Sequence, residues 1–279
     1  MARELEFWQQ AERSLIKKYR RELWTPFITA VQRYELIGEG DRIAVCVSGG
    51  KDSMLLAKLM QELERHGNTP FEAVYLCMDP GYNAENRARI EKNAQKLHVP
   101  LQIFESDIFE VAHAQTHSAC YLCAKMRRGH LYARARELGC NKIALGHHFN
   151  DVIETTIMGM LWSGQLQAMP PKLHSQNFSG MELIRPLYRV HEDDIIAWTR
   201  HHGLEFLQCA CRFTEESAQR EGLSKRRETK ELLRALRPEN PNVEKSIFNA
   251  VHTVNVDTFP GWKTGGAEHS FLENYEKRR

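Results

Sequence analysis

The segment Ser48-Gly49-Gly50-Lys51-Asp52-Ser53 combines two glycines, a lysine, an acid and two hydroxyls within six residues. It follows the apolar run 43–47 and precedes the largely apolar run 54–60, so it is expected to join a buried strand to a helix. Glycine lets the backbone approach an anion closely, and the first turn of a helix presents unpaired N–H groups with partial positive charge. This segment, here named the phosphate loop, therefore predicts a site for phosphate.

Two common phosphate-binding motifs do not fit the phosphate loop. Its spacing is not Gly-x-x-x-x-Gly-Lys-Ser/Thr, and no Gly-x-Gly-x-x-Gly follows the strand, which disfavours P-loop kinases, GTPases and dinucleotide-binding enzymes. The alternative is a glycine-rich turn that binds no ligand. We expect a nucleotide site, because six specified positions stand between a predicted strand and a predicted helix.

A second polar segment, Gly146-His147-His148-Phe149-Asn150-Asp151, follows another predicted strand. In a doubly wound sheet, ligands bind beyond the carboxyl ends of the strands, so this segment, the phosphate loop and Asp79 are expected to converge. A carboxylate beside a triphosphate usually holds Mg²⁺, and Asp151 is therefore predicted to bind the metal or activate the substrate. The other interpretation is that Asp151 caps the following helix, a role in which Asn150 would serve equally well, and the two roles are compatible.

Four of the seven cysteines form two short motifs, Cys120-Tyr121-Leu122-Cys123 and Cys209-Ala210-Cys211. A Cys-x-x-Cys at a helix start presents two thiolates to one ion or cluster, because the helix N-terminus lowers their pKa. Three interpretations stay open: a redox pair, a structural zinc with four ligands, and an iron–sulfur cluster in which three cysteines leave one iron open. The other three cysteines lie in or beside apolar strands and are expected to be buried: Cys46, Cys77 and Cys140.

The elements that must hold these residues alternate along the chain. Apolar periodicity predicts strands at 42–47, 71–78, 100–104 and 142–145 and helices at 52–66, 83–97, 121–138 and 150–162. Strands separated by helices indicate βαβ units with right-handed crossovers. The expected fold is therefore α/β, with a doubly wound parallel sheet.

Helical extensions flank this sheet in the prediction. A basic amphipathic helix is expected over 5–37 with a break at Pro26, and a hairpin is expected from 172–174 and 182–184. Further helices are predicted at about 191–202, 224–236 and 242–254. The tail from Thr258 is expected to wrap the surface or fray.

Three parts of the chain follow from these elements. Residues 1–40 are expected to form an N-terminal helical extension, residues 41–215 the nucleotide-binding and catalytic domain, and residues 216–279 C-terminal helices and a tail packed on that domain.

The composition is that of a globular protein, with 279 residues of which 42% are hydrophobic and 27% charged. No apolar run approaches the roughly 20 residues needed to span a bilayer, and the N-terminus lacks a secretory hydrophobic region. Seven cysteines, an odd number, without an export signal favour free thiols or metal ligands over disulfides. We expect a cytoplasmic protein without membrane contact.

Basic residues cluster although the net charge is only +2. The clusters lie at 13–21, 125–136 and 225–237. They fit a polyanionic partner that is contacted through its phosphates, and solvated helix faces give the same pattern.

The phosphate loop resembles the Ser-Gly-Gly-x-Asp-Ser signature of the PP-loop ATP pyrophosphatases, which split ATP between the α and β phosphates and adenylate a substrate. Further motifs stand in the order of the tRNA 2-thiocytidine biosynthesis family: Cys120-x-x-Cys123 with the following 125–132, the block 142–148, Met169-Pro170-Pro171-Lys172, Ile184-Arg185-Pro186-Leu187 and the late cysteine pair. The resemblance to this family of iron–sulfur tRNA thiolases covers about residues 35 to 255.

This resemblance implies an ATP-dependent tRNA sulfurtransferase. Such an enzyme binds ATP and Mg²⁺ and adenylates the C2 oxygen of a base in the anticodon loop, which is expected to be a cytidine. Sulfide carried on the open iron of a [4Fe-4S] cluster then displaces AMP. The implied partners are tRNA and a cysteine desulfurase or another sulfide donor. The resemblance does not decide whether the protein forms a homodimer.

The resemblance also assigns roles to residues of this sequence. The implied ATP-binding residues are Ser48, Gly49, Gly50, Lys51, Asp52, Ser53, Asp79 and Gly146. Asp151, also the expected Mg²⁺ ligand, and Arg127 are implied to be catalytic. The implied cluster ligands are Cys120, Cys123 and Cys211, with Cys209 as the alternative third ligand. Within the basic clusters, Arg128, Arg226 and Lys230 are the expected tRNA contacts.

Two departures from the family pattern bear on this assignment. Asn150-Asp151 stands where the family usually has two consecutive acids, so Asp151 is expected to act alone, and the late pair is Cys-x-Cys instead of Cys-x-x-Cys. Two alternatives are kept. A PP-loop amide ligase explains the phosphate loop but leaves the cysteines unused, and a PP-loop nucleotide-binding protein would use them for structural zinc.

Overall fold

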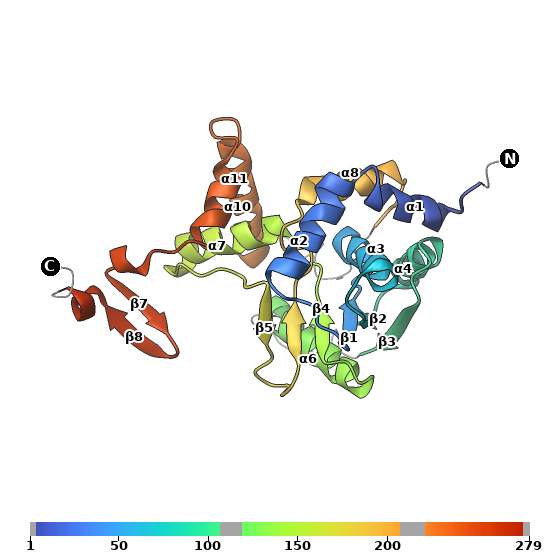
Figure 1. Ribbon diagram of the computed structural model, residues 1–279, viewed down its shortest axis with the longest axis horizontal. Helices are drawn as coiled ribbons and strands as arrows, with labels where there is room; N and C mark the ends of the chain where they lie inside the picture. Colours follow the sequence, from blue (N-terminus) through green and yellow to red (C-terminus); the bar gives the residue numbers. More distant parts are fainter. Residues whose placement is uncertain (1–3, 107–118, 207–220, 276–279) are drawn as a thin grey trace.

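A six-stranded sheet forms the centre of the computed structural model, which describes residues 4–106, 119–206 and 221–275 (Figure 1). Its strand order is β3-β2-β1-β4-β6-β5. The strands are β1 (Arg42–Cys46), β2 (Glu72–Asp79), β3 (Leu101–Glu105), β4 (Lys142–Ala144), β5 (Lys172–His174) and β6 (Glu182–Ile184). All neighbouring pairs are parallel except β5 with β6, the hairpin predicted from the sequence.

Both faces of the sheet are covered, as alternate residues of β1 demonstrate. Ile43 and Val45 lie in one buried cluster with residues of α3 (Lys51–His66), α4 (Ala84–Lys96) and α8 (Glu192–His201). Ala44 and Cys46 lie in a second cluster with residues of α6 (Ala119–Glu137). Successive side chains of a strand point to opposite faces, so a strand buried on both reads as a continuous apolar run. The predicted doubly wound α/β fold is confirmed, with β5 as its antiparallel exception.

The strand order places a switch point beside β1. The chain runs outward from β1 through β2 to β3, and then returns to place β4 on the other side of β1. Ligands of open α/β sheets bind at such a point, beyond the carboxyl ends of the strands. The phosphate loop follows β1, and the segment 145–148 follows β4, so this topology brings together the two segments that the sequence singled out.

The N-terminal helices pack on the helices α3 and α8. They are α1 (Phe7–Ile16), the π-helix η1 (Arg20–Trp24) and α2 (Thr25–Arg33). The expected break at Pro26 is wrong, because Pro26 lies in the first turn of α2, where a missing N–H removes no helical hydrogen bond. Glu12 of α1 accepts hydrogen bonds from Lys58 at 2.7 Å and from Arg65 at 2.8 Å, which ties α1 to α3.

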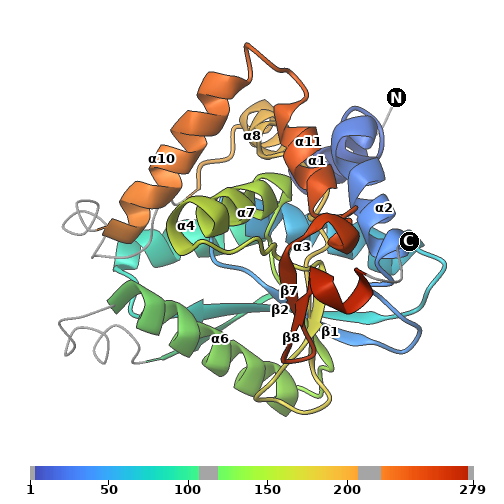
Figure 2. The same cartoon turned by 90° about the vertical axis from the view of Figure 1, so that its left-hand side faces the viewer.

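The C-terminal helices lie beside one another (Figure 2) and share a third apolar cluster. It joins α7 (Phe149–Ser163), α10 (Glu221–Leu236) and α11 (Val243–Ala250) through side chains that include Phe149, Leu233 and Phe248. No helix within the described ranges is long and apolar enough to cross a membrane.

The tail differs from the expectation. It contains η2 (Val256–Thr258), an antiparallel hairpin of β7 (Gly261–Thr264) and β8 (Ala267–Ser270), and η3 (Phe271–Asn274). The hairpin lies at the edge of the molecule, far from β1 (Figure 1). Gly265 and Gly266 form its turn with φ of +58° and +82°, conformations that favour glycine, so this tail is folded instead of wrapping the surface or fraying.

Candidate active site

The phosphate loop is closed by its own hydroxyl groups. Ser53 accepts a hydrogen bond from the backbone N–H of Ser48 at 3.1 Å and donates one to the carbonyl of Gly50 at 2.9 Å. Gly49 has a φ of +80°, which explains the need for glycine there. Gly50 is the N-cap of α3 and supplies no capping side chain, so no side chain of the loop blocks the positive end of this helix.

The end of β4 approaches the phosphate loop through Gly146. A Cβ atom at Gly146 would lie 3.1 Å from the backbone nitrogen of Ser53 and 3.2 Å from the carbonyl carbon of Asp52. These are tighter than ordinary contacts between a Cβ and main-chain atoms. Glycine at position 146 is therefore required for the backbone after β4 to approach the backbone of the phosphate loop. This contact explains why Gly146 lies at the site.

Asp151 lies at the start of α7, which begins earlier than the sequence predicts. His148 is the N-cap: its Nδ1 accepts from the N–H of Asp151 at 3.4 Å, and Asp151 accepts from the N–H of His148 at 3.0 Å. The interpretation of Asn150 as the cap is wrong, since Asn150 instead accepts a hydrogen bond from the N–H of Glu192 at 2.9 Å.

One cavity of about 530 Å³ connects part of the predicted site, although Gly49, Gly50 and Lys51 do not belong to its lining. Its lining includes Ser48, Asp52, Ser53, Gly146, His147 and Asp151. To the same lining α6 contributes Arg127, Arg128 and Leu131, and apolar surface comes from Val47, Met78 and Leu145. The cavity thus combines an anion-binding loop, two carboxylates and two guanidinium groups.

Asp79 lies outside this lining and stabilises the loop that follows β2. Its Oδ1 accepts from the N–H groups of Gly81 at 2.9 Å and Tyr82 at 2.7 Å, and its Oδ2 lies 3.1 Å from Arg87. The Asp79 carboxylate is therefore already occupied by its own chain.

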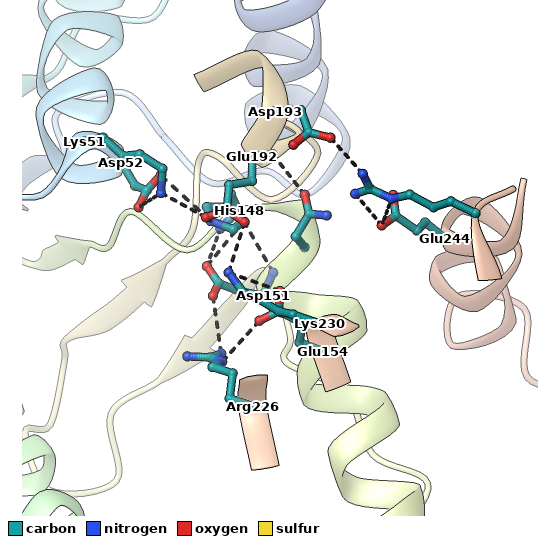
Figure 3. A network of polar contacts seen from close by, with 12 residues as sticks. Lys51, Asp52, His148, Asp151, Glu154, Glu192, Asp193, Arg226, Lys230 and Glu244 are labelled. Atoms are coloured by element: carbon teal, nitrogen blue, oxygen red, sulfur yellow. Dashed lines mark hydrogen bonds and ion pairs between the residues drawn. The ribbon is translucent and has the colours of Figure 1, made fainter. Parts of the chain in front are cut away.

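A network of charged side chains borders the phosphate loop (Figure 3). Lys51 contacts the carboxylates of Asp52 at 3.1 Å and Glu192 at 3.0 Å. Lys230 of α10 lies 3.0 Å from Glu192 and 3.6 Å from Glu154. Arg226, also of α10, lies 3.3 Å from Asp151 and 3.2 Å from Glu154. Arg226 and Lys230, expected to contact tRNA, are thus paired with acids of α7 and α8.

The two histidines of the segment after β4 have different surroundings. Because Nδ1 of His148 accepts a hydrogen bond, its Nε2 carries the proton in the neutral ring, and it lies 3.8 Å from Asp52 and 3.9 Å from Glu192. His147 lines the cavity, and burial lowers the pKa of its imidazole to about 4. His147 is therefore neutral near pH 7.

The cysteine motifs are only partly within the described residues. Cys120 and Cys123 lie in the first two turns of α6, whereas Cys209 and Cys211 lie outside the described ranges. Within the described residues, no three His, Cys, Asp or Glu side chains are grouped to hold a metal ion. Cys46, Cys77 and Cys140 are buried free thiols as predicted, and burial raises the pKa of Cys46 and Cys77 to about 12.

A parallel sheet whose first strand leads through Ser-Gly-Gly-Lys-Asp-Ser into a helix defines a PP-loop protein, and the family profile described as "PP-loop domain" matches residues 25–220. Curated relatives named tRNA-cytidine(32) 2-sulfurtransferase are 36% identical in Geotalea uraniireducens (strain Rf4) and 37% identical in Geotalea daltonii. Each alignment covers 81% of this chain and 88% of the relative. The chain belongs to the tRNA-cytidine(32) 2-sulfurtransferase family of PP-loop enzymes, which confirms the resemblance and makes it a transferase.

The solved structure of U34-tRNA thiolase NcsA from Methanococcus maripaludis with its [4Fe-4S] cluster has a similar fold. The TM-score is 0.65 at 19% identity, covering 86% of this chain and 78% of that chain. At this identity the likeness supports the fold and carries no residue assignment.

Glu192 is the main site residue that the sequence prediction missed. The sequence contains Glu192-Asp193-Asp194 at the start of a predicted helix, and acids there are usually explained by the helix dipole. Only the position of α8 beside the phosphate loop reveals that Glu192 contacts Lys51.

Proposed function

We propose that this protein is an ATP-dependent tRNA sulfurtransferase that replaces the C2 oxygen of a cytidine with sulfur. The relatives named above support this substrate. The observation that carries the proposal is the shared cavity: its lining joins residues of the phosphate loop and Asp151 with Arg127 and Arg128 of α6, the helix that also carries Cys120 and Cys123.

In this proposal, the phosphate loop binds the triphosphate of ATP. Its backbone N–H groups, the positive end of α3 and the Lys51 ammonium provide the attraction. Mg²⁺ usually binds through one or two carboxylates and phosphate oxygens, and Asp151 and Asp52 both line the cavity. Asp52 would share its carboxylate between the metal and Lys51, whose Nζ atom lies 3.1 Å from Oδ1 of Asp52.

The chemical step then begins on the base. The C2 oxygen of the cytidine attacks the α-phosphorus of ATP, the bond to the β-phosphate oxygen breaks, and pyrophosphate leaves. Sulfide then adds at C2, AMP leaves with the former C2 oxygen, and the proton of the hydrosulfide is released. Arg127 and Arg128 would stabilise the negative charge on the phosphates during this exchange.

The cysteines would hold a [4Fe-4S] cluster. Positions 120, 123 and 127 share one face of a helix, because residues three to four apart are neighbours, and Arg127 lines the cavity. Three protein thiolates, from Cys120, Cys123 and Cys211 or Cys209, leave one of four iron sites open, unlike a closed structural zinc site. When bound, such a cluster would supply sulfide at its open iron, and a cysteine desulfurase or another donor would provide that sulfur.

Contacts to tRNA would begin at Arg128, which lines the cavity. For Arg226 and Lys230, a tRNA phosphate would have to exchange with the carboxylates that now pair with them, since both cations lie within 3.3 Å of an acid.

The test is a nucleoside analysis of tRNA from cells with and without this gene, by mass spectrometry. We expect 2-thiocytidine to disappear with the gene, to return with the unsubstituted protein and to stay absent with Cys120→Ala. Loss of a 2-thiouridine instead would contradict the substrate, and an unchanged thionucleoside pattern would contradict the sulfurtransferase itself. Incorporation of ammonia by the purified protein would favour the amide ligase.

A further inference from the structure

Lys51, the cation of the phosphate loop, is held in place from a distant part of the sequence. Its Nζ atom donates hydrogen bonds to Asp52 at 3.1 Å and to Oε1 of Glu192 at 3.0 Å (Figure 3). Glu192 is the first residue of α8, and its side chain is 20% exposed. A carboxylate beside a triphosphate site repels the ligand, so its presence requires an explanation.

Glu192 is itself fixed by two other elements. Asn150 of α7 accepts a hydrogen bond from the backbone N–H of Glu192 at 2.9 Å, and Asn150 is buried. Lys230 of α10 donates to Oε2, the second carboxylate oxygen, at 3.0 Å. The next residue, Asp193, is 70% exposed and contacts Arg237 away from the phosphate loop. Of these two adjacent acids, Glu192 is the one directed at the loop.

Both partners stay charged near pH 7. Burial alone would raise the pKa of Glu192, but Lys51 and Lys230 lower it to about 2. Burial alone would lower the pKa of Lys51, but Asp52 and Glu192 raise it above its usual value. A free lysine side chain loses rotamer entropy when it is ordered. A lysine that is already ordered by Glu192 avoids part of that cost when it contacts phosphate.

We propose that Glu192 is a positioning residue for ATP, which holds the Lys51 ammonium at the phosphate loop before the nucleotide binds and is aligned for this by Asn150. The inference rests on the proposed binding of ATP at this loop. The proposal also gives a role to Asn150, which stands where the family pattern has an acid. The side-chain oxygen of Asn150 aligns α8, and the carboxylate near Lys51 is supplied by Glu192.

The experiment measures ATP affinity by calorimetry with the full-length protein. Glu192→Gln keeps the shape of the side chain and removes its charge, and we expect roughly ten-fold weaker ATP binding with kcat at saturating ATP almost unchanged. Asn150→Ala should weaken binding in the same direction. Asp193→Asn is the matched control, because it makes the same chemical change one residue away and should bind ATP like the unsubstituted protein.

A double-mutant cycle separates positioning from a general effect on folding. If Glu192 acts through Lys51, then Glu192→Gln should weaken ATP binding in the native background and have no further effect in Lys51→Met. ATP binding by Glu192→Gln that equals that of the unsubstituted protein would overturn the inference. Tighter binding would also overturn it, because Glu192 would then be a competitor of phosphate for Lys51. Failure of the unsubstituted protein to bind ATP would overturn the proposed function as well.

Discussion

The Nε atom of Arg226 in α10 lies 3.2 Å from a carboxylate oxygen of Glu154 in α7, yet neither atom completes a hydrogen bond. The Glu154 side chain is 3% exposed, and Lys230 approaches its other oxygen at 3.6 Å. Burial outweighs these two cations and raises the pKa of Glu154 to about 7. The contact between α7 and α10 therefore depends on a carboxyl group that changes its charge near neutral pH.

Glu154 should make the stability of the protein fall as the pH rises. Its pKa is near 4.5 when unfolded and about 7 when folded, so the folded state binds more protons between these values. Stability then decreases with increasing pH across that window and levels off above it. Urea unfolding at several pH values should show this slope in the unsubstituted protein relative to Glu154→Gln. A constant difference between the two proteins from about pH 5 to pH 8 would contradict the assignment.

Gly50→Val should weaken ATP binding without unfolding the protein. A Cβ at Gly50 meets only Ser48 Oγ at 3.6 Å, so the side chain is tolerated until phosphate must approach the backbone. We expect at least roughly ten-fold weaker binding by calorimetry, or about 1.4 kcal/mol. Gly38→Val is a matched control, because its Cβ would also lie 3.6 Å from a side-chain oxygen but far from the cavity lining. Unchanged ATP affinity in Gly50→Val would rule out the phosphate site.

Asp151→Asn should separate the structural and chemical roles of this residue. An amide oxygen can still accept the hydrogen bond from the His148 N–H, so α7 should keep its start. The lost charge should raise the Mg²⁺ concentration for half-maximal thiolation by at least roughly ten-fold. Steady-state assays at graded Mg²⁺ provide the measurement. If the Mg²⁺ dependence stays the same, Asp151 serves the helix and not the metal.

Cysteine substitutions should distinguish the cluster from structural zinc. We expect loss of thiolation and of the brown colour of anaerobically purified protein in each of Cys120→Ala, Cys123→Ala and Cys211→Ala. A cubane cluster with only three protein ligands is not retained when one of them is removed. Absorbance near roughly 400 nm and iron analysis provide the readout. Cys140→Ala is the control, since Cys140 is a buried free thiol of the apolar core and should leave both properties intact.

Cys209 tests the choice of third ligand. Loss of the cluster in Cys209→Ala with retention in Cys211→Ala would move the ligand by two residues and leave the mechanism in place. One zinc ion that requires Cys120, Cys123, Cys209 and Cys211, with no iron, would exclude the thiolase mechanism.

The sequence predicted the sheet well, because β1 and β2 are continuous apolar runs bounded by glycine and polar residues. It also predicted which loops converge, since the carboxyl ends of parallel strands share one edge. The start of α7 was predicted to within one residue, but its cap was not, because His148 caps the helix through a ring nitrogen and histidine is not among the usual capping residues.

The charge pairs of the site were beyond sequence reasoning. Arg226 and Lys230 belong to a basic run that also fits a solvated or RNA-binding face. Their pairing with Glu154 and Glu192 depends on how α10 packs against α7 and α8, and that packing is decided by apolar side chains such as Leu233. Local patterns contain no information on such long-range contacts.

The contact of Gly146 with the phosphate loop joins main chain to main chain, at 3.1 Å for a Cβ placed there. Side-chain substitutions on this wall therefore have little means to alter the distance between the two loops. The part of the lining that α6 contributes is made of side chains, among them Arg127, Arg128 and Leu131. Substitutions on α6 can therefore reshape that part of the cavity one residue at a time, while the spacing of the two main-chain segments is kept.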